Sequence, residues 1–238
     1  MSRSVKAPLF AALLCAVALV PLAVAAYSFG PVETLDRHLL FDLRREAGVG
    51  HAFGAAFVNL GDVAALLVML AAVCAIGLSF GRRREVLAAA VVVAGANVTT
   101  QVLKSVLEHV RSKAFERGWE LPWPDSFPSG HTTAAASIAV ALLLVVPAGH
   151  RLLAAAVGAA LTTAVALAVV ILGWHYPSDV LGALLVVAAW GLCAVAFLRR
   201  RRLMPEVGLE PTSPQGQSIL SRSRMPIPPL RRDAAKEL

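Results

Sequence analysis

The sequence has 238 residues, of which 58% are hydrophobic and 16% are charged, and its mean hydropathy is +0.70. This composition excludes an ordinary water-soluble domain and predicts an all-α integral membrane protein. The net charge of +7 does not indicate a nucleic-acid partner, because residues 199–238 hold nine Lys or Arg against four Asp or Glu and so supply five of the seven charges. A basic tail beside a membrane surface accounts for that excess.

The first apolar segment covers residues 8–27 and is long enough to cross about 30 Å of hydrocarbon as a helix. The basic residues Arg3 and Lys6 before it, and the small residues before Tyr27, are also typical of a cleavable signal peptide. Residues 1–27 are therefore a first transmembrane helix or a signal segment. Either choice places the residues that follow on the outer side of the membrane.

Residues 28–62 mix leucines with charged side chains, as in the run from Leu35 and Asp36 to Leu39. Such a pattern predicts an amphipathic helix that lies in the membrane interface on the extracytoplasmic side. Its expected role is packing or lipid access.

Further apolar segments follow, and the fourth span of the chain is short enough that we expect it to begin near Ser129. They cover residues 63–80, 86–103, 132–146, 152–174 and 180–198. With the first segment they predict six transmembrane helices, with a transmembrane core at 63–198. Residues 199–238 are basic and rich in Pro and Ser, which predicts a disordered cytoplasmic tail.

Basic residues predict the orientation of the chain, because short loops rich in Lys and Arg stay in the cytoplasm. Such loops hold Arg82–Arg84, His150 with Arg151, and Arg199–Arg202. Both termini are then cytoplasmic in a multi-pass protein of the cell membrane. The connections that carry the unusual polar residues lie on the extracytoplasmic face.

The first group of candidate site residues is Lys104 and Arg111, seven residues apart at the end of the third apolar segment. A cation near hydrocarbon is costly unless it reaches water or meets an anion, so Lys104 is either a phosphate ligand or a side chain that extends to the interface. Arg111 has a planar guanidinium that suits phosphate oxygens, although a lone surface arginine is often only solvated.

The second group is Ser129, Gly130 and His131, at the start of the fourth span. A serine cap, a glycine that allows close approach and the free N–H groups of a helix N-terminus together form an anion site. The alternative is a plain helix start followed by an interfacial histidine.

The third group is His175 and Asp179, which lie four residues apart before the sixth span. A carboxylate at this spacing can orient an imidazole and leave its other nitrogen free to attack phosphorus. Alternatively, Asp179 is only a favourable charge at a helix N-terminus and His175 is solvated. Because all three groups lie on one predicted face, we interpret them together as a phosphate site.

These residues resemble the motifs of the type 2 phosphatidic acid phosphatase family. Its pattern is Lys, six residues and Arg-Pro; then Pro-Ser-Gly-His; then Ser-Arg, five residues, His, three residues and Asp. Lys104 and Arg111 match the first motif, residues 128–131 match the second completely, and His175 with Asp179 match the end of the third. The resemblance covers roughly residues 85–198.

Two positions depart from the pattern. Ser112 replaces a proline, and Ala168 with Val169 replaces Ser-Arg. Loss of that arginine removes a charged clamp for phosphate. Lys113 or Arg117 is a possible substitute.

The resemblance implies a metal-independent phosphatase without a cofactor that acts on a phosphorylated lipid. His175 would attack phosphorus and form a phosphohistidine, Asp179 would support it, and His131 would protonate the leaving oxygen. The ligands of the phosphate oxygens would be Lys104, Arg111, Ser129 and Gly130.

Several substrates and two other functions stay open. Phosphatidic acid, phosphatidylglycerol phosphate and polyprenyl carriers of cell-wall synthesis all fit, and the Ala-, Val- and Arg-rich composition is typical of a GC-rich bacterial genome, which favours a polyprenyl carrier by association. Val169 favours a weak enzyme or a non-catalytic lipid-phosphate binding or transport protein. A polar cluster within the third span resembles the midplane site of an unrelated transporter, or leads to Lys104; it consists of Asn97, Thr99, Thr100 and Gln101. The oligomeric state is not predicted.

Overall fold

The computed structural model describes residues 3–28, 30–46, 50–107 and 126–203, and these residues are almost entirely helical. They belong to one compact unit, Met1–Leu203, whereas the second unit, Met204–Leu238, lies outside the described residues. The helices are α1 (Arg3–Ser28), α2 (Gly30–Glu46), α3 (Gly50–Val58), η1 (Asn59–Gly61), α4 (Val63–Ser79), α5 (Arg83–Leu107), α6 (Gly130–Val145), η4 (Ala148–His150), α7 (Arg151–Ile171) and α8 (Pro177–Leu203).

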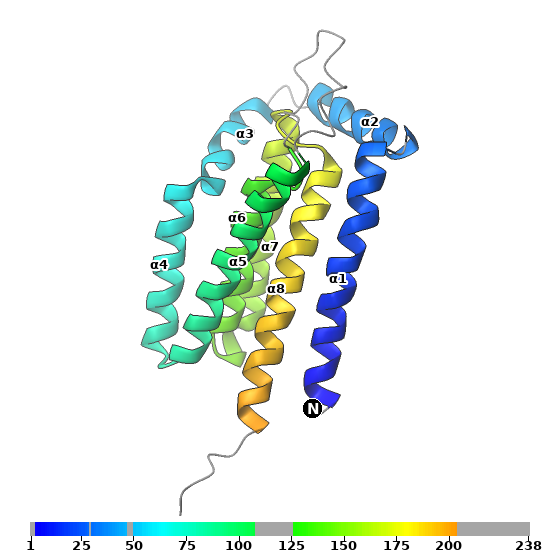
Figure 1. Ribbon diagram of the computed structural model, residues 1–238. Helices are drawn as coiled ribbons and strands as arrows, with labels where there is room; N and C mark the ends of the chain where they lie inside the picture. The colour runs from blue at the N-terminus through cyan, green and yellow to red at the C-terminus, as the bar shows by residue number, and fades with distance from the viewer. Residues whose placement is uncertain (1–2, 29, 47–49, 108–125, 204–238) are drawn as a thin grey trace, which may run out of the picture. The chain divides into compact units, whose positions relative to one another are not determined.

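Helices α1 and α4–α8 coincide with the six apolar segments that the sequence indicates (Figure 1). Within the described residues, the candidate membrane spans are Val5–Ser28, Arg83–Leu107, Ala148–Ile171 and Pro177–Arg200. A fifth candidate is the pair Ala52–Gly61 and Val63–Ser79, which is bent by 62°, and α6 is a shorter apolar helix of 16 residues. The chain is thus a multi-pass helical membrane protein, and a topology of six spans stays a prediction.

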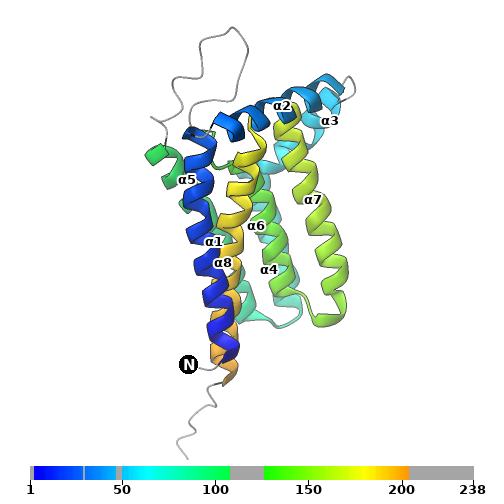
Figure 2. The same cartoon turned by 90° about the vertical axis from the view of Figure 1, so that its right-hand side faces the viewer.

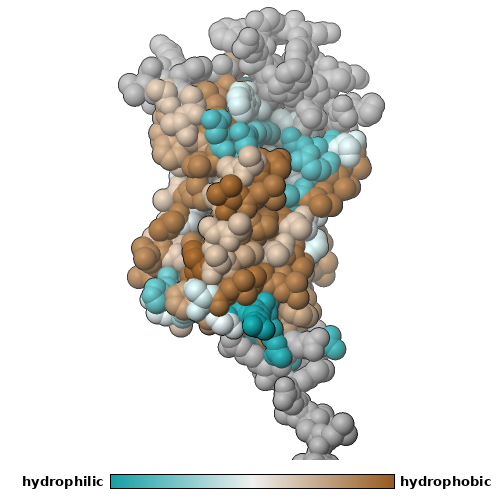
Figure 3. Space-filling model, turned by 90° about the vertical axis from the view of Figure 1, so that its left-hand side faces the viewer, coloured by the Kyte–Doolittle hydropathy of each residue, from teal (hydrophilic) through white to brown (hydrophobic). Residues whose placement is uncertain are grey.

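Large apolar side chains cover much of the outer surface of the helices. Leu152 is 84% exposed and Val68 is 70% exposed. Exposure of many such side chains is unfavourable in water but suits contact with lipid. Figure 3 shows hydrophobic side chains over the middle of one face, with hydrophilic residues toward both ends. This distribution is expected of a protein that lies in a bilayer.

Small residues fill the contacts between the helices. Ala89, Ala96, Ala135 and Ala141 are fully buried along α5 and α6. On α7, a Cβ added at Gly158 would lie 2.7 Å from the Cβ atom of Ala139 in α6. Small side chains at these points allow helix backbones to approach closely, which is how helices associate where lipid removes the hydrophobic driving force.

Polar side chains of α5 bond to neighbouring helices. The hydroxyl groups of Thr100 and Thr133 in α6 lie 3.0 Å apart, and Trp190 Nε1 in α8 donates to Thr99 Oγ1 at 3.1 Å. Asn97 Nδ2 donates to the hydroxyl oxygen of Ser137 at 3.3 Å. Asn97, Thr99 and Thr100 therefore join α5 to α6 and α8, so these bonds explain their presence in an apolar span without a transport pathway.

Helix α2 lies across one end of the bundle, beside the first turn of α8 and the last turn of α7 (Figures 1 and 2). Leu40 is fully buried there against Val58, Val169 and Tyr176. Leu35, Leu39 and Leu43 are exposed on another face of the same helix. The mixed sequence pattern thus forms a helix with a docked face and an exposed apolar stripe, and its placement in the interface stays a prediction.

We expect Gly158→Val to destabilise the bundle, because its Cβ would also lie 3.1 Å from the Cα atom of Ala139 and would push α6 and α7 apart. Overpacking of this kind costs about 1–3 kcal/mol. Thermal unfolding of the purified protein in detergent measures the loss. Ala156→Val, at an exposed position of α7, is the control and should unfold near the wild-type temperature. Equal stability of the two variants would contradict the close contact.

Candidate active site

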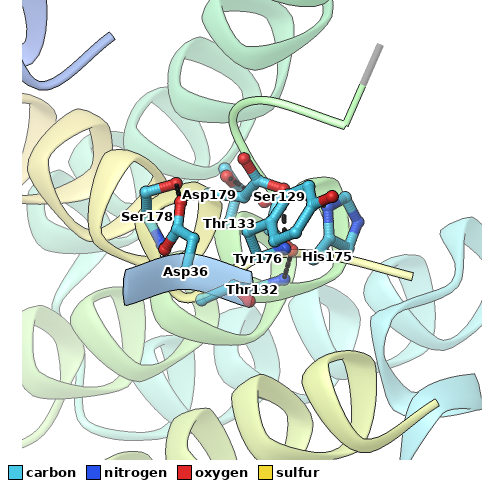
Figure 4. Close-up of polar contacts among 8 residues, drawn as sticks. All are labelled: Asp36, Ser129, Thr132, Thr133, His175, Tyr176, Ser178 and Asp179. Atoms are coloured by element: carbon cyan, nitrogen blue, oxygen red, sulfur yellow. Dashed lines mark hydrogen bonds and ion pairs between the residues drawn. The ribbon is translucent and has the colours of Figure 1, made fainter. Parts of the chain in front are cut away.

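Three of the predicted site residues, Ser129, His175 and Asp179, lie close together where α6 and α8 begin (Figure 4). Ser129 N–H donates to the carbonyl oxygen of Asp179 at 3.0 Å, which joins the two helix starts. A Cβ added at Gly130 would lie 3.9 Å from Cε of Lys104, so the lysine is next to the second motif. Arg111 lies outside the described residues.

Ser129 is the N-cap of α6, as its sequence context predicts. Its backbone is extended, and its hydroxyl oxygen accepts the N–H of Thr132 at 3.3 Å. The hydroxyl of Thr133 donates back to the carbonyl oxygen of Ser129 at 2.8 Å. This local network fixes the Ser-Gly-His turn at a helix N-terminus, where free N–H groups and the helix dipole favour an anion.

His175 and Asp179 form a buried pair. His175 Nδ1 lies 3.4 Å from Asp179 Oδ2, and the same oxygen accepts the backbone N–H of Tyr176 at 2.9 Å. The side chain of Asp179 is fully buried and that of His175 is 7% exposed. Because the carboxylate faces Nδ1, Nε2 is the nitrogen of His175 that points away from the pair and is available for chemistry.

His131 lies close to this pair. The ring centres of His131 and His175 are 6.4 Å apart, which allows both imidazoles to reach one phosphoryl group. His131 Nε2 also lies 3.3 Å from Asp62 Oδ1, at the residue that caps α4. Asp62 makes no side-chain cap bond to α4 and instead faces the histidine. Sequence reasoning missed this contact, because an aspartate before an apolar run indicates only a helix start.

Asp36 is a second residue that sequence reasoning did not assign to the site. It is buried in α2, and its carboxylate accepts the backbone N–H of Ser178 at 3.0 Å and the hydroxyl of the same serine. Ser178 precedes Asp179 in the first turn of α8. The sequence signal for this contact is the spacing of Asp36 and Leu40, which places the carboxylate on the same helix face as a leucine that can be buried.

Val169, at the position of the family arginine, is fully buried in the apolar cluster with Leu40 and Tyr176. Its carbonyl oxygen accepts the N–H groups of Trp174 and His175, at 2.9 and 3.2 Å. The residue therefore supports the backbone of the histidine loop, and its side chain has no charge to offer a phosphate. Lys113 and Arg117, the possible substitutes, lie outside the described residues.

Metal-ligating side chains do not cluster in the part of the chain that the structure describes. There, no group of three or more His, Cys, Asp or Glu side chains is placed to hold a metal ion. The groups gathered there include Lys104, two imidazoles and the N-terminus of α6. Such an arrangement suits an anion with several oxygens, and a histidine with a carboxylate behind it suits nucleophilic attack on that anion.

The fold is that of a helical membrane protein, and the described candidate site residues gather at one end of its bundle. Residues 85–203 match the family model of the PAP2 superfamily, and this match covers half of the chain. The protein therefore belongs to this superfamily, the type 2 phosphatidic acid phosphatases that its motifs resemble.

One solved structure with the same fold is the crystal structure of a transmembrane PAP2-type phosphatidylglycerolphosphate phosphatase from Bacillus subtilis. The two chains are 20% identical, with a TM-score of 0.64, and the match covers 83% of this chain and 99% of that one. No curated protein matches the sequence. At this identity the likeness concerns the fold, which extends beyond the residues of the family match.

We expect Gly182→Ala to lower phosphatase activity, because α8 passes close to the segment that leads into the Ser-Gly-His turn. A Cβ at Gly182 would lie 2.6 Å from Cζ of Phe127 and 3.3 Å from Cβ of Pro128. Phe127 is fully buried, so its ring has little free space, and either α8 or the segment before the turn must shift. A displacement of about 1 Å near a reacting group can cost about 100-fold in rate.

Phosphate release under conditions that saturate the wild type measures the effect. Gly149→Ala is the matched control, since no atom lies within 4 Å of its added Cβ. Wild-type activity in Gly182→Ala would contradict the proposed packing of α8 against the turn.

Proposed function

We propose that this protein is a membrane phosphatase that hydrolyses a lipid-linked phosphate or pyrophosphate through a phosphohistidine on His175. The observation that carries the proposal is the buried pair of His175 and Asp179 beside the Ser129–His131 turn. Membership of the PAP2 superfamily supports phosphatase activity, and the apolar outer surface supports a lipid substrate.

The reaction has two displacements. In the first, Nε2 of His175 forms a bond to phosphorus as the bond from phosphorus to the leaving oxygen breaks, and His131 gives a proton to that oxygen. In the second, a water molecule attacks the phosphorus of the phosphohistidine while His131 takes a proton from that water. The bond from phosphorus to Nε2 breaks, which releases phosphate and restores His175. Asp179 stabilises the positive charge of the His175 ring in both steps.

The phosphate oxygens are held by fixed positive groups. Lys104 and the N-terminus of α6 at Ser129 and Gly130 are the described candidates, and Arg111 is the further ligand that the first motif predicts. Preorganised donors of this kind stabilise the charge that develops during phosphoryl transfer. No metal ion or cofactor takes part in this proposal.

We further propose six spans with the site at the extracytoplasmic face of the cell membrane. The basic loops share the other end of the bundle, where Arg82, Arg151 and Arg199 line one cleft of about 580 Å³. Basic loops of this length favour the cytoplasmic side. Both termini are then cytoplasmic, and residues 28–62 are extracytoplasmic.

The substrate is an amphiphile whose tail remains in the bilayer while its phosphate enters the site. Phosphatidic acid, phosphatidylglycerol phosphate and polyprenyl phosphates or pyrophosphates all have this form. The similar Bacillus subtilis protein is a phosphatidylglycerolphosphate phosphatase, which makes that lipid a necessary member of any substrate panel.

A second candidate function is binding or transport of a phosphorylated lipid without efficient hydrolysis. Val169 is the observation in its favour, because a buried valine replaces the arginine that the family pattern places there. A pocket that only binds has no use for a histidine held by a buried carboxylate, which favours the enzyme.

We expect phosphate release from at least one of four substrates, namely a polyprenyl pyrophosphate, phosphatidic acid, phosphatidylglycerol phosphate and a water-soluble phosphate ester. Release should persist with a chelator present. His175→Ala should lower it by about 1,000-fold or more, since removal of a nucleophile leaves only binding and electrostatic effects.

His150→Ala is the matched control, because this exposed histidine lies beyond α6 at the other end of the bundle. It should keep wild-type activity. Loss of activity with chelator would contradict the metal-independent reaction. Tight lipid binding without any release would support the second candidate function.

A further inference from the structure

The first turn of α8 is bonded to a residue that is distant in sequence. Asp36 in α2 is 142 positions away from Ser178, and it accepts both the backbone N–H and the hydroxyl of that serine (Figure 4). Asp36 also lies outside residues 85–203, which match the family model. The contact is thus not one that the three motifs contain.

These bonds complete the N-terminus of α8. The helix begins at Pro177, which has no N–H, so Ser178 supplies its first backbone donor. Asp36 is only 5% exposed, and a buried carboxylate needs donors of this kind to remain charged at low cost. Its negative charge is also favourable at the positive end of the helix.

The first turn of α8 also sets where Asp179 points. Tyr176 precedes the helix and Asp179 is its third residue, and Asp179 Oδ2 reaches back to accept the N–H of Tyr176, as an acidic residue does in a capping box. The same oxygen faces Nδ1 of His175. Because Ser178 is the residue next to Asp179, the bonds from Ser178 to Asp36 fix the turn from which Asp179 orients the histidine.

An apolar contact of α2 lies beside the bonds of Asp36. Leu40, one turn after Asp36, is fully buried against Val169 and Tyr176, which flank the histidine loop. The two residues share one face of α2, so the apolar contact and the carboxylate dock together. One face of α2 therefore contacts both the histidine loop and the first turn of α8.

We propose that Asp36 is a positioning residue, which holds the first turn of α8 so that Asp179 orients His175 for attack. The inference rests on the proposed function, because it assigns a role to Asp36 only through that pair. It gives one residue of α2, a helix outside residues 85–203, a part in positioning the nucleophile.

The test compares kcat and KM for the best lipid substrate across variants of this contact. Asp36→Ala should lower kcat by about 10- to 100-fold and change KM by less than about 3-fold, because misplacement of a reacting group affects the chemical step. Asp36→Asn should recover most of kcat, since its amide can accept the N–H of Ser178 and donate to the hydroxyl oxygen.

A double variant tests whether the effect passes through Ser178. Ser178→Ala should reduce kcat less than Asp36→Ala does, because the backbone bond remains. Addition of Ser178→Ala to Asp36→Ala should change kcat by less than about 2-fold, since the partner of the hydroxyl is already absent. The proposed coupling from Asp36 through Ser178 to Asp179 would be overturned if the losses of kcat in the two single variants added fully in the double variant. It would also be overturned if Asp36→Asn lost as much kcat as Asp36→Ala.

Asp42→Asn is the matched control, because it removes an exposed carboxylate from the same helix and should leave kcat unchanged. Thermal unfolding is recorded for every variant, and kcat is measured well below the lowest transition. A lowered unfolding temperature with wild-type kcat in Asp36→Ala would overturn the positioning role. If His175→Ala keeps activity, the proposed function itself fails, which is a separate result.

Discussion

The proposed chemistry depends on the close approach of two helix N-termini at one end of the bundle. The hydrogen bond from Ser129 N–H to the carbonyl oxygen of Asp179 joins the start of α6 to the start of α8. Through it, the turn that offers N–H groups to an anion is held against the loop that carries His175. Neither element alone gives an anion site with a nucleophile beside it.

The membrane setting explains how this approach is maintained. In lipid, helices associate through small side chains and interhelical hydrogen bonds. Buried alanines on α5 and α6 and the Thr100–Thr133 contact bring those helices together, and Trp190 bonds α8 to Thr99. The packing that makes the protein stable in a bilayer therefore also sets the spacing of the site.

The local features of the site were predictable from the sequence, because each depends on short spacings. The cap at Ser129 and the pair of His175 and Asp179 follow from helix geometry over three or four residues. Likewise, the apolar segments indicated where the helices of the bundle lie.

The long-range contacts were not predictable in this way. Asp36 and Asp62 have ordinary surroundings in the sequence, and their roles depend on how α2 and α4 pack against the end of the bundle. The sequence shows that Val169 departs from the family pattern, which has an arginine at this position. Only the fold places its side chain in an apolar cluster.

The central claim is covalent catalysis by His175, and a trapped intermediate tests it most directly. Protein mixed briefly with a lipid substrate labelled on its terminal phosphate would be quenched in alkali and mapped by mass spectrometry. The account predicts an acid-labile, alkali-stable phosphoryl group on Nε2 of His175, formed and lost at rates that match turnover. Label on another residue, or turnover through hydrolysis without any phosphoenzyme, would contradict it.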